Sequence, residues 1–298
     1  MLKIPKPPIF SFAECRWFLD RNYDDCLHEI AEDSIVKLVK IEGTIVLLEI
    51  KEEDDYLLVN CLAGNHPSSQ SLVNFVTDWL DLERDLSPFY QLLEKDEALS
   101  YMAQDYFGLR LIGIPDLFEA LCWSIIGQQI NLSFAYKCKR ALVEKYGFIK
   151  SYRDVNFYLF PEPSDLANLT IEDLKLLQFS RQKATYIIGI AKLFTDRHTF
   201  KEDILSLQEE DLIARELIKM KGVGAWTANY VMMKSLRCPN ALPYGDVGLY
   251  NALHALKNFP KRPTKERLDT FFVPFDGWKA YLTHYLWRSL AVPNYAKK

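Results

Sequence analysis

The sequence predicts an α+β fold in which a small antiparallel β-rich N-terminal domain precedes a mainly helical remainder. Two observations support this prediction. Between residues 34 and 62, apolar and polar residues alternate in short runs, which is the two-residue period of a half-buried strand. From about residue 71 onward, apolar residues recur every three or four positions, which is the period of an amphipathic helix.

The β-rich part contains three segments separated by short polar breaks. Residues 34–41 and 44–50 are divided by Glu42 and Gly43, and the acidic run 52–55 precedes residues 56–62. Three such runs with short connections predict an antiparallel meander. A helix is expected somewhere within residues 13–31.

Capping patterns locate the first helices of the second part. Asp116 is the expected N-cap of a helix that ends at Gly127, and Glu119 completes a capping-box pattern with it. Ser133 is expected to cap a second helix that stops near Gly147.

Six further helices follow the same apolar period toward the C-terminus. Ser180 is expected to open a helix over residues 183–194. Ser206 and Glu209 form another capping-box pattern, which predicts a helix from 207 to about 220. The remaining predicted helices span residues 225–236, 246–256, 264–272 and 278–291.

Composition and charge restrict the function classes. The 298 residues are 49% hydrophobic and 26% charged, which is enough apolar material for two or three packed domains. The net charge is −4, yet residues 215–298 carry 14 Lys and Arg against 5 Asp and Glu, a net of +9. A basic C-terminal third on an acidic body favours a local phosphate-binding face.

Several other classes are disfavoured. The six cysteines contain no CxxC pair, and no histidine pair has metal-site spacing. The longest apolar stretches, 44–48 and 186–190, fall well short of the ~20 residues that cross a bilayer. Prolines interrupt the N-terminus before a secretory signal could form. We therefore expect a cytoplasmic protein, associated with the nucleoid if the cell is bacterial.

One segment, residues 217–230, has the pattern of a helix, a tight turn and a second helix. In the turn Gly222 and Gly224 flank Val223. Glycines allow positive φ and a close backbone approach, and the start of the second helix offers free N–H groups to an anion. Val223 is expected to point inward between the helices. Taken alone, the turn fits a DNA contact and a purely structural corner equally well.

The wider pattern resembles the helix–hairpin–helix base-excision DNA glycosylases, of the alkylbase, DNA-3-methyladenine glycosylase II type. It consists of Gly-Val-Gly followed by Thr-Ala, and of Asp246 after Pro-Tyr-Gly, supported by stretches 111–130, 178–184 and 278–287. The resemblance covers about residues 105–291. It implies an α+β domain over 1–100 followed by a helical core of two subdomains. The first subdomain covers 101–238 and contains the hairpin at about 213–230, and the second covers 239–298 and packs with about 85–115.

The same resemblance implies a monofunctional DNA glycosylase of base excision repair. Such an enzyme acts as a monomer on duplex DNA and hydrolyses the N-glycosidic bond of a flipped alkylated purine, of the 3-methyladenine or 7-methylguanine type. Trp226 occupies the position where bifunctional members carry a Schiff-base lysine, which argues against lyase activity. No cysteine follows Cys238, so an iron–sulfur cluster is not expected. We expect no required cofactor.

Residue by residue, the resemblance makes Asp246 the catalytic carboxylate, although an aspartate before a helix is most often only an N-cap. It places Trp226, Tyr230 and Trp278 around the flipped base. A purine alkylated at N3 or N7 is cationic, so it stacks favourably on electron-rich rings and leaves readily.

The resemblance also implies a set of DNA contacts. Gln128 and Gln129 would fill the gap left by the flipped nucleotide, although some members carry a leucine at the position of Gln129. Phosphate contacts are implied for Gly222, Gly224, Thr227 and Lys221, and a structural monovalent cation, Na⁺ or K⁺, for the main-chain carbonyls of Ile218, Met220 and Val223.

Three alternatives remain open at this stage. The enzyme could act on other lesions, such as hypoxanthine or oxidised bases. The chain could bind DNA through the hairpin without catalysis, which Asp246 in its motif disfavours. It could also be an acidic helical interaction protein, which the basic C-terminal third disfavours.

Overall fold

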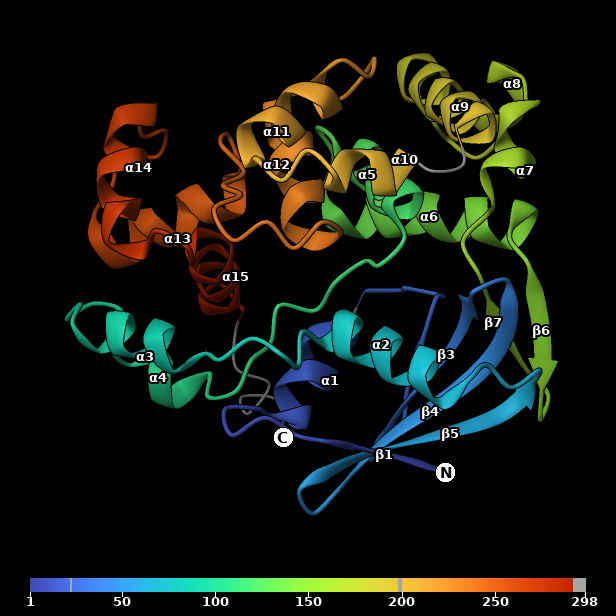
Figure 1. Ribbon diagram of the computed structural model, residues 1–298. Coiled ribbons are helices and arrows are strands. Elements are labelled where there is room, and N and C mark those ends of the chain that lie inside the picture. The colour runs from blue at the N-terminus through green and yellow to red at the C-terminus, as the bar shows by residue number, and fades with distance from the viewer. Residues whose placement is uncertain (22, 198–199, 292–298) are drawn as a thin grey trace.

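The N-terminal part of the computed structural model, which describes residues 1–21, 23–197 and 200–291, is a five-stranded antiparallel sheet (Figure 1). The strand order is β1-β5-β4-β3-β2. The predicted meander is confirmed as β3 (Ser34–Ile41), β4 (Thr44–Glu53) and β5 (Tyr56–Gly64). Strands β1 (Leu2–Pro5) and β2 (Glu29–Ile30) were not expected, because four and two residues are too few to show a period.

Two helices cover one face of this sheet. They are α1 (Phe12–Asp20), which lies within the stretch where a helix was expected, and α2 (Ser69–Leu80). Phe12 of α1 and Trp79 of α2 join Val39 and Leu48 of the strands in one buried cluster. On the opposite face, Leu38 and Leu47 pack with Phe157 of an unpredicted hairpin, β6 (Ile149–Tyr152) and β7 (Val155–Tyr158).

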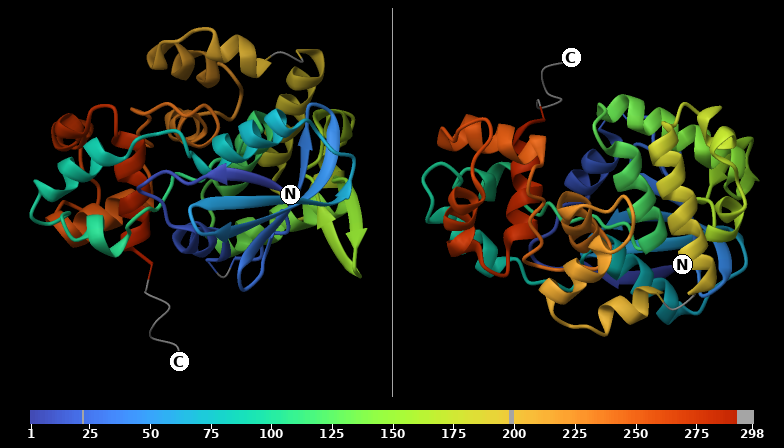
Figure 2. Two further views of the ribbon diagram at one scale, coloured as in Figure 1. Left: turned by 60° about the horizontal axis from the view of Figure 1, so that its bottom comes forward. Right: turned by 90° about the horizontal axis from the view of Figure 1, so that it is seen from above.

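The helical part has its own large core, in which buried residues from Leu86 to Leu286 form a single cluster. Helix α5 lies at its centre, and nine of its eleven residues are buried. Figure 2 shows the last helices grouped together as a lobe beside the others. The helices are α3 (Ser87–Glu94), α4 (Met102–Asp105), α5 (Leu117–Gly127), α6 (Leu132–Tyr146), α7 (Pro163–Ala167), α8 (Ile171–Lys175), α9 (Arg181–Asp196), α10 (Phe200–Leu205), α11 (Glu210–Ile218), α12 (Ala225–Lys234), α13 (Val247–Lys257), α14 (Lys265–Phe272) and α15 (Lys279–Ser289), with a 3₁₀ turn at Val273–Phe275.

The predicted helix starts at Asp116 and Ser180 are confirmed, whereas the one at Ser133 is wrong. The Asp116 carboxylate accepts a hydrogen bond from the backbone N–H of Glu119 at 2.6 Å, and Ser180 caps α9 in the same way. The prediction of Ser133 as a cap is wrong, because Asn131 accepts from Phe134 N at 2.8 Å and starts α6 two residues earlier. Asparagine caps helices about as well as serine, so the apolar period alone could not separate the two.

Neither predicted capping box forms. Glu119 turns its carboxylate toward Lys139 instead of back to Asp116. Ser206 does not start a helix, since its hydroxyl donates to the Asp203 carbonyl at the end of α10, and Gln208 then adopts φ 59° before α11 begins. The predicted helix 207–220 is therefore shorter and is preceded by a separate helix, α10.

The segment after the sheet returns to the C-terminal lobe. The ring of Phe89 in α3 stacks on Trp278 at 5.6 Å between centroids, and the hydroxyls of Tyr90 and Tyr285 are 2.9 Å apart. These contacts bring α3 onto α15, while the domain limits given above stay a prediction. None of the helices in the described ranges is long and apolar enough to cross a membrane.

Candidate active site

The hairpin between α11 and α12 depends on two glycines that differ in role. Gly222 has φ 97°, and a Cβ there would lie 2.3 Å from the ring of Tyr186 in α9. Gly224 has φ −92° and no neighbouring atom within 4 Å of an added Cβ. Val223 is buried between them, as predicted, and donates its N–H to the Met220 carbonyl at 3.0 Å. The turn is thus tight at Gly222 and open to a partner at Gly224.

Gln128 holds this hairpin from the end of α5. Its side-chain amide donates to the Gly222 carbonyl and to the Thr227 hydroxyl, both at 3.0 Å. Gln129 is exposed and has a left-handed backbone at φ 56°. Because the amide of Gln128 is engaged within the protein, Gln129 is the better placed of the two to enter DNA, and that role stays a prediction.

Asp246 is both a helix cap and a wall of a cavity. One carboxylate oxygen, Oδ1, accepts from Leu249 N at 2.7 Å and from the indole N–H of Trp287 at 2.8 Å. The other oxygen accepts from the indole N–H of Trp226 at 3.0 Å. An added Cβ on Gly248 would lie 3.2 Å from both Asp246 Oδ1 and Trp287 Cδ1, so this glycine leaves room for the indole to reach the carboxylate.

Aromatic rings continue from Asp246 along one side of the cavity. Trp226 stacks on Tyr230 with centroids 5.5 Å apart, and Tyr230 lies 6.2 Å from Trp287. The Tyr230 hydroxyl accepts from the indole N–H of Trp123 at 2.9 Å. Burial raises the pKa of Tyr230, so it is a neutral phenol at physiological pH. The wall offers flat, electron-rich faces to a planar ligand.

Trp278 does not belong to this wall. It packs on Phe89 with the Arg84 guanidinium 5.6 Å from its ring, and it does not line the cavity. Its expected place is taken by Trp287, nine residues further along. Trp278 is the non-helical residue before α15, whereas Trp287 lies in its last turn, and only Trp287 reaches Asp246. The order of the two tryptophans in the sequence does not say which of them reaches it.

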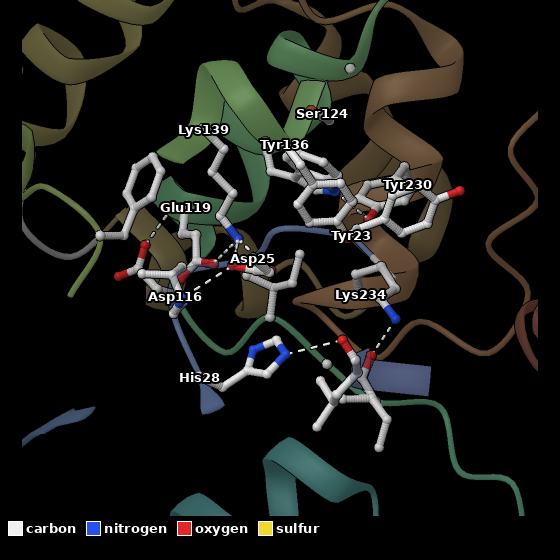
Figure 3. Close-up of a pocket in the computed structure, with 18 of the residues that line it drawn as sticks. Tyr23, Asp25, His28, Asp116, Glu119, Ser124, Tyr136, Lys139, Tyr230 and Lys234 are labelled. Carbon is white, nitrogen blue, oxygen red and sulfur yellow. Dashed lines mark hydrogen bonds and ion pairs between the residues drawn. The ribbon is translucent and has the colours of Figure 1, made fainter. Parts of the chain in front are cut away.

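The cavity has a volume of about 1670 Å³ and lies between the N-terminal part and the helices (Figure 3). It is lined by the Asp246 carboxylate and its aromatic wall at one end. At the other end it is lined by charged side chains of the 21–28 loop, β3, α5 and α6, which were not predicted: Asp25, His28, Lys37, Asp116, Glu119 and Lys139.

The charged end is built around Lys139, whose side chain is almost fully buried. Its ammonium lies 3.1 Å from Asp25 and 3.5 Å from Glu119. Burial alone would raise the pKa of Asp25, but the Lys139 ammonium outweighs it and holds that pKa well below its usual range. Burial lowers the pKa of His28, so this imidazole is neutral at physiological pH. No sequence pattern indicated this cluster, because its members lie on separate elements.

The predicted phosphate and cation contacts lie in and beside the hairpin turn, where Met220, Val223 and Thr227 are buried. Lys221 is exposed, whereas Lys219 is paired with Glu216. The Met220 carbonyl accepts one hydrogen bond, from Val223, and a carbonyl oxygen has a second lone pair for a cation. Hard oxygen donors of this kind fit Na⁺ or K⁺ better than a transition metal.

Comparisons with known proteins place the chain in context. Residues 122–274 match the model of the HhH-GPD superfamily of base excision DNA repair proteins, and residues 19–121 match that of the 8-oxoguanine DNA glycosylase N-terminal domain. The chain is 37% identical over 295 residues to the DNA-3-methyladenine glycosylase of Bacillus subtilis, covering 97% of each chain. It is 26% identical to DNA-3-methyladenine glycosylase 2 of Escherichia coli, covering 60% of each.

Solved structures show the same fold. A 3-methyladenine DNA-glycosylase from Archaeoglobus fulgidus superposes with a TM-score of 0.84 at 22% identity, covering 98% of this chain and 100% of that one. An 8-oxoguanine glycosylase/lyase from Clostridium acetobutylicum gives 0.73 at 20% identity, covering 96% and 98%. The sheet and the helical body are therefore shared by proteins named for different damaged bases.

Proposed function

Because the chain belongs to the HhH-GPD superfamily of base excision DNA repair proteins, and is thus a base-excision DNA glycosylase, we propose that it is specific for alkylated purines and hydrolyses them without lyase activity. The observation that carries this proposal is the Asp246 carboxylate, held by two indole N–H groups beside a wall of flat rings. The 37% identity to a DNA-3-methyladenine glycosylase supports it.

The proposed reaction needs only the carboxylate and water. As the C1′–N bond breaks, its electron pair leaves with the base and positive charge develops on the sugar. Asp246 stabilises this charge and orients a water molecule, whose oxygen then bonds to C1′ while its proton passes to the carboxylate and on to solvent. A purine alkylated at N3 or N7 already carries a positive charge, so it leaves as a neutral base without an added acid.

The proposed specificity follows from the wall. A cationic base can stack on the rings of Trp226, Tyr230 and Trp287. Each cation–π contact of this kind stabilises the bound base by about 0.5–2 kcal/mol. An indole at position 226 has no amine that could form a Schiff base, so the product is an intact strand with an abasic site. We infer further that the enzyme works as a monomer, with Gly224, Thr227 and Lys221 at one phosphate.

The test is single-turnover release of 7-methylguanine from duplex DNA in the presence of a chelator. We expect the wild type to release the free base, and Asp246→Asn to slow release about 10²–10³-fold, the usual effect of losing one preorganised charge. Asparagine caps helices about as well as aspartate, so the thermal midpoint and DNA affinity should stay close to wild type.

Three results would contradict the proposal. Retained release by Asp246→Asn would leave this residue as a helix cap only. Bound but uncut methylated DNA would favour a binding protein. Borohydride trapping of a covalent protein–DNA adduct in quantity would indicate a lyase.

A further inference from the structure

The charged end of the cavity holds acceptors that the protein does not use. Asp116 Oδ1 accepts from Glu119 N, and Glu119 Oε1 pairs with Lys139. In the described parts of the chain no hydrogen bond reaches the second oxygen of either carboxylate. Figure 3 shows these side chains facing the same space as Tyr136 and Tyr230.

This end is continuous with the aromatic wall. The Tyr230 hydroxyl is bonded to Trp123, and Trp123 lies 4.6 Å from Tyr136 between ring centroids. The Lys139 ammonium is 5.3 Å from the centroid of Trp123. A ligand that rests on the wall beside Asp246 therefore has an unbroken aromatic path to the charged end.

The space exceeds what a base requires. The cavity of about 1670 Å³ is larger than the roughly 300–1,000 Å³ of pockets that hold a whole drug-sized ligand, and a purine is smaller than such a ligand. Charged groups at the charged end of the cavity are costly to desolvate without partners, so apolar occupants are disfavoured there. An occupant with a hydrogen-bond donor fits the unused carboxylate oxygens.

We propose that Asp116, Glu119 and Lys139 form a second subsite, which receives the polar end of an extended alkyl substituent on the flipped base. The proposal rests on the proposed function, since the base itself lies at Asp246. Its substrate class is a purine whose N-alkyl chain ends in a hydroxyl. The hydroxyl donates to the free carboxylate oxygen of Glu119 and can accept from the Lys139 ammonium, while Asp116 adds negative charge beside it.

The test compares guanines that carry one of three N7 substituents in the same duplex: methyl, an alkyl chain, and a chain of equal length that ends in a hydroxyl. All three are cationic and leave as the same ring. For the wild type we expect half-maximal single-turnover excision of the hydroxyl-ended base at an enzyme concentration about tenfold lower than for the plain chain, the effect of one buried hydrogen bond.

Two substitutions of Glu119 by residues of similar volume show whether it recognises the hydroxyl or only supports the fold. Glu119→Gln keeps an acceptor oxygen and should keep the preference, whereas Glu119→Leu should lose it, and neither should change 7-methylguanine release more than about threefold. Wild type that treats both chains alike, or rejects both, overturns the proposal. So does a loss in Glu119→Leu that is equal for all three bases, because the cluster then only joins the two parts of the protein. If wild type releases none of the bases, the proposed function fails instead.

Discussion

At the residue scale, the position of Asp246 is determined by groups that are far apart in the sequence. Its carboxylate receives a backbone N–H from its own helix and one indole N–H each from α12 and α15. Charge-assisted hydrogen bonds are stronger than neutral ones, and three of them fix both oxygens in one orientation. Capping and facing the cavity are therefore compatible roles for one side chain.

Trp287 should act as a positioning residue for this carboxylate. Trp287→Phe keeps a ring but removes the N–H that reaches Asp246 Oδ1, so we expect the maximal single-turnover rate to fall about tenfold with DNA affinity near wild type. Trp278→Phe is the matched control, because that indole packs on Phe89 outside the cavity. Equal rate losses in the two variants would show that Trp287 acts only through the fold.

Asp116 should make stability depend on pH. Although Asp116 keeps an exposed surface, the protein around its carboxylate excludes enough water to raise its pKa to about 6, aided by Glu119 and Glu162, above the value near 4 in an unfolded chain. A raised folded pKa contributes stability that is fully present below pH 4 and is lost as the pH rises through 6. Asp116→Asn keeps the cap, so its thermal midpoint relative to wild type should rise between pH 4.5 and 7.5. A difference that does not change with pH would contradict this assignment.

The sequence predicted residues whose role is local better than residues whose role depends on packing. Asp246, Trp226 and Tyr230 lie close to one motif, and the structure brings all three to one cavity. Trp287 was missed because two tryptophans share one helix region and the sequence does not show which faces inward. Asp25 and Lys139 meet across 114 positions, which no local pattern can reveal.

At the element scale, the hairpin combines a tight turn with an open helix start. Val223 is buried in the turn between the two helices, and the amide of Gln128 bridges to Gly222 and Thr227. Gly224, as the N-cap of α12, leaves the first N–H groups of that helix accessible. Free N–H groups at a helix start attract a phosphate oxygen.

Replacing each glycine of the hairpin by alanine should affect a different property: stability at Gly222 and DNA affinity at Gly224. Gly222→Ala adds a methyl group against the ring of Tyr186 at positive φ, so we expect a loss of about 1–3 kcal/mol in the free energy of unfolding. Gly224→Ala meets no protein atom, so its stability should fall by less than about 1 kcal/mol while DNA affinity falls more. Thermal melts and DNA titrations on the same two proteins give both values. Equal loss of stability would leave no special role for the open side of the turn.

The bounds of the strands and helices show where sequence periodicity alone predicts an element correctly. The predicted strands and the last three helices are close to those observed, because each has a clear period and a clear break. The errors fall at polar starts with two candidate caps, such as Asn131 and Ser133, and where a helix divides near Ser206. The β6–β7 hairpin was missed because its four-residue strands are stabilised by packing against β3, not by their own pattern.

At the scale of the whole molecule, the sheet and the helical body are joined by charged side chains as well as by apolar packing. The buried Arg110 guanidinium donates to the carbonyls of Ile9, Asp81 and Arg84, and Lys139 of α6 pairs with Asp25. The cavity lies along this joint, so residues of both parts line it. That arrangement gives the N-terminal part a direct place in the site.

The uneven charge of the chain predicts how DNA binding responds to salt. Lys221 is exposed beside the hairpin turn, in the basic third that also includes Lys297 and Lys298, which lie outside the described residues. Each phosphate contact contributes close to 0.9 to the slope of log affinity against log salt. Lys221→Gln should therefore lower that slope by about 0.9 and weaken binding to damaged and undamaged duplexes alike.

Lys3→Gln, in the exposed Lys3–Glu53 pair of the sheet, removes the same charge far from the hairpin and should leave the slope unchanged. Fluorescence titrations at several salt concentrations measure both slopes. If the two variants lower the slope equally, the position of the charge has no bearing on where DNA binds, and only the net charge of the protein counts.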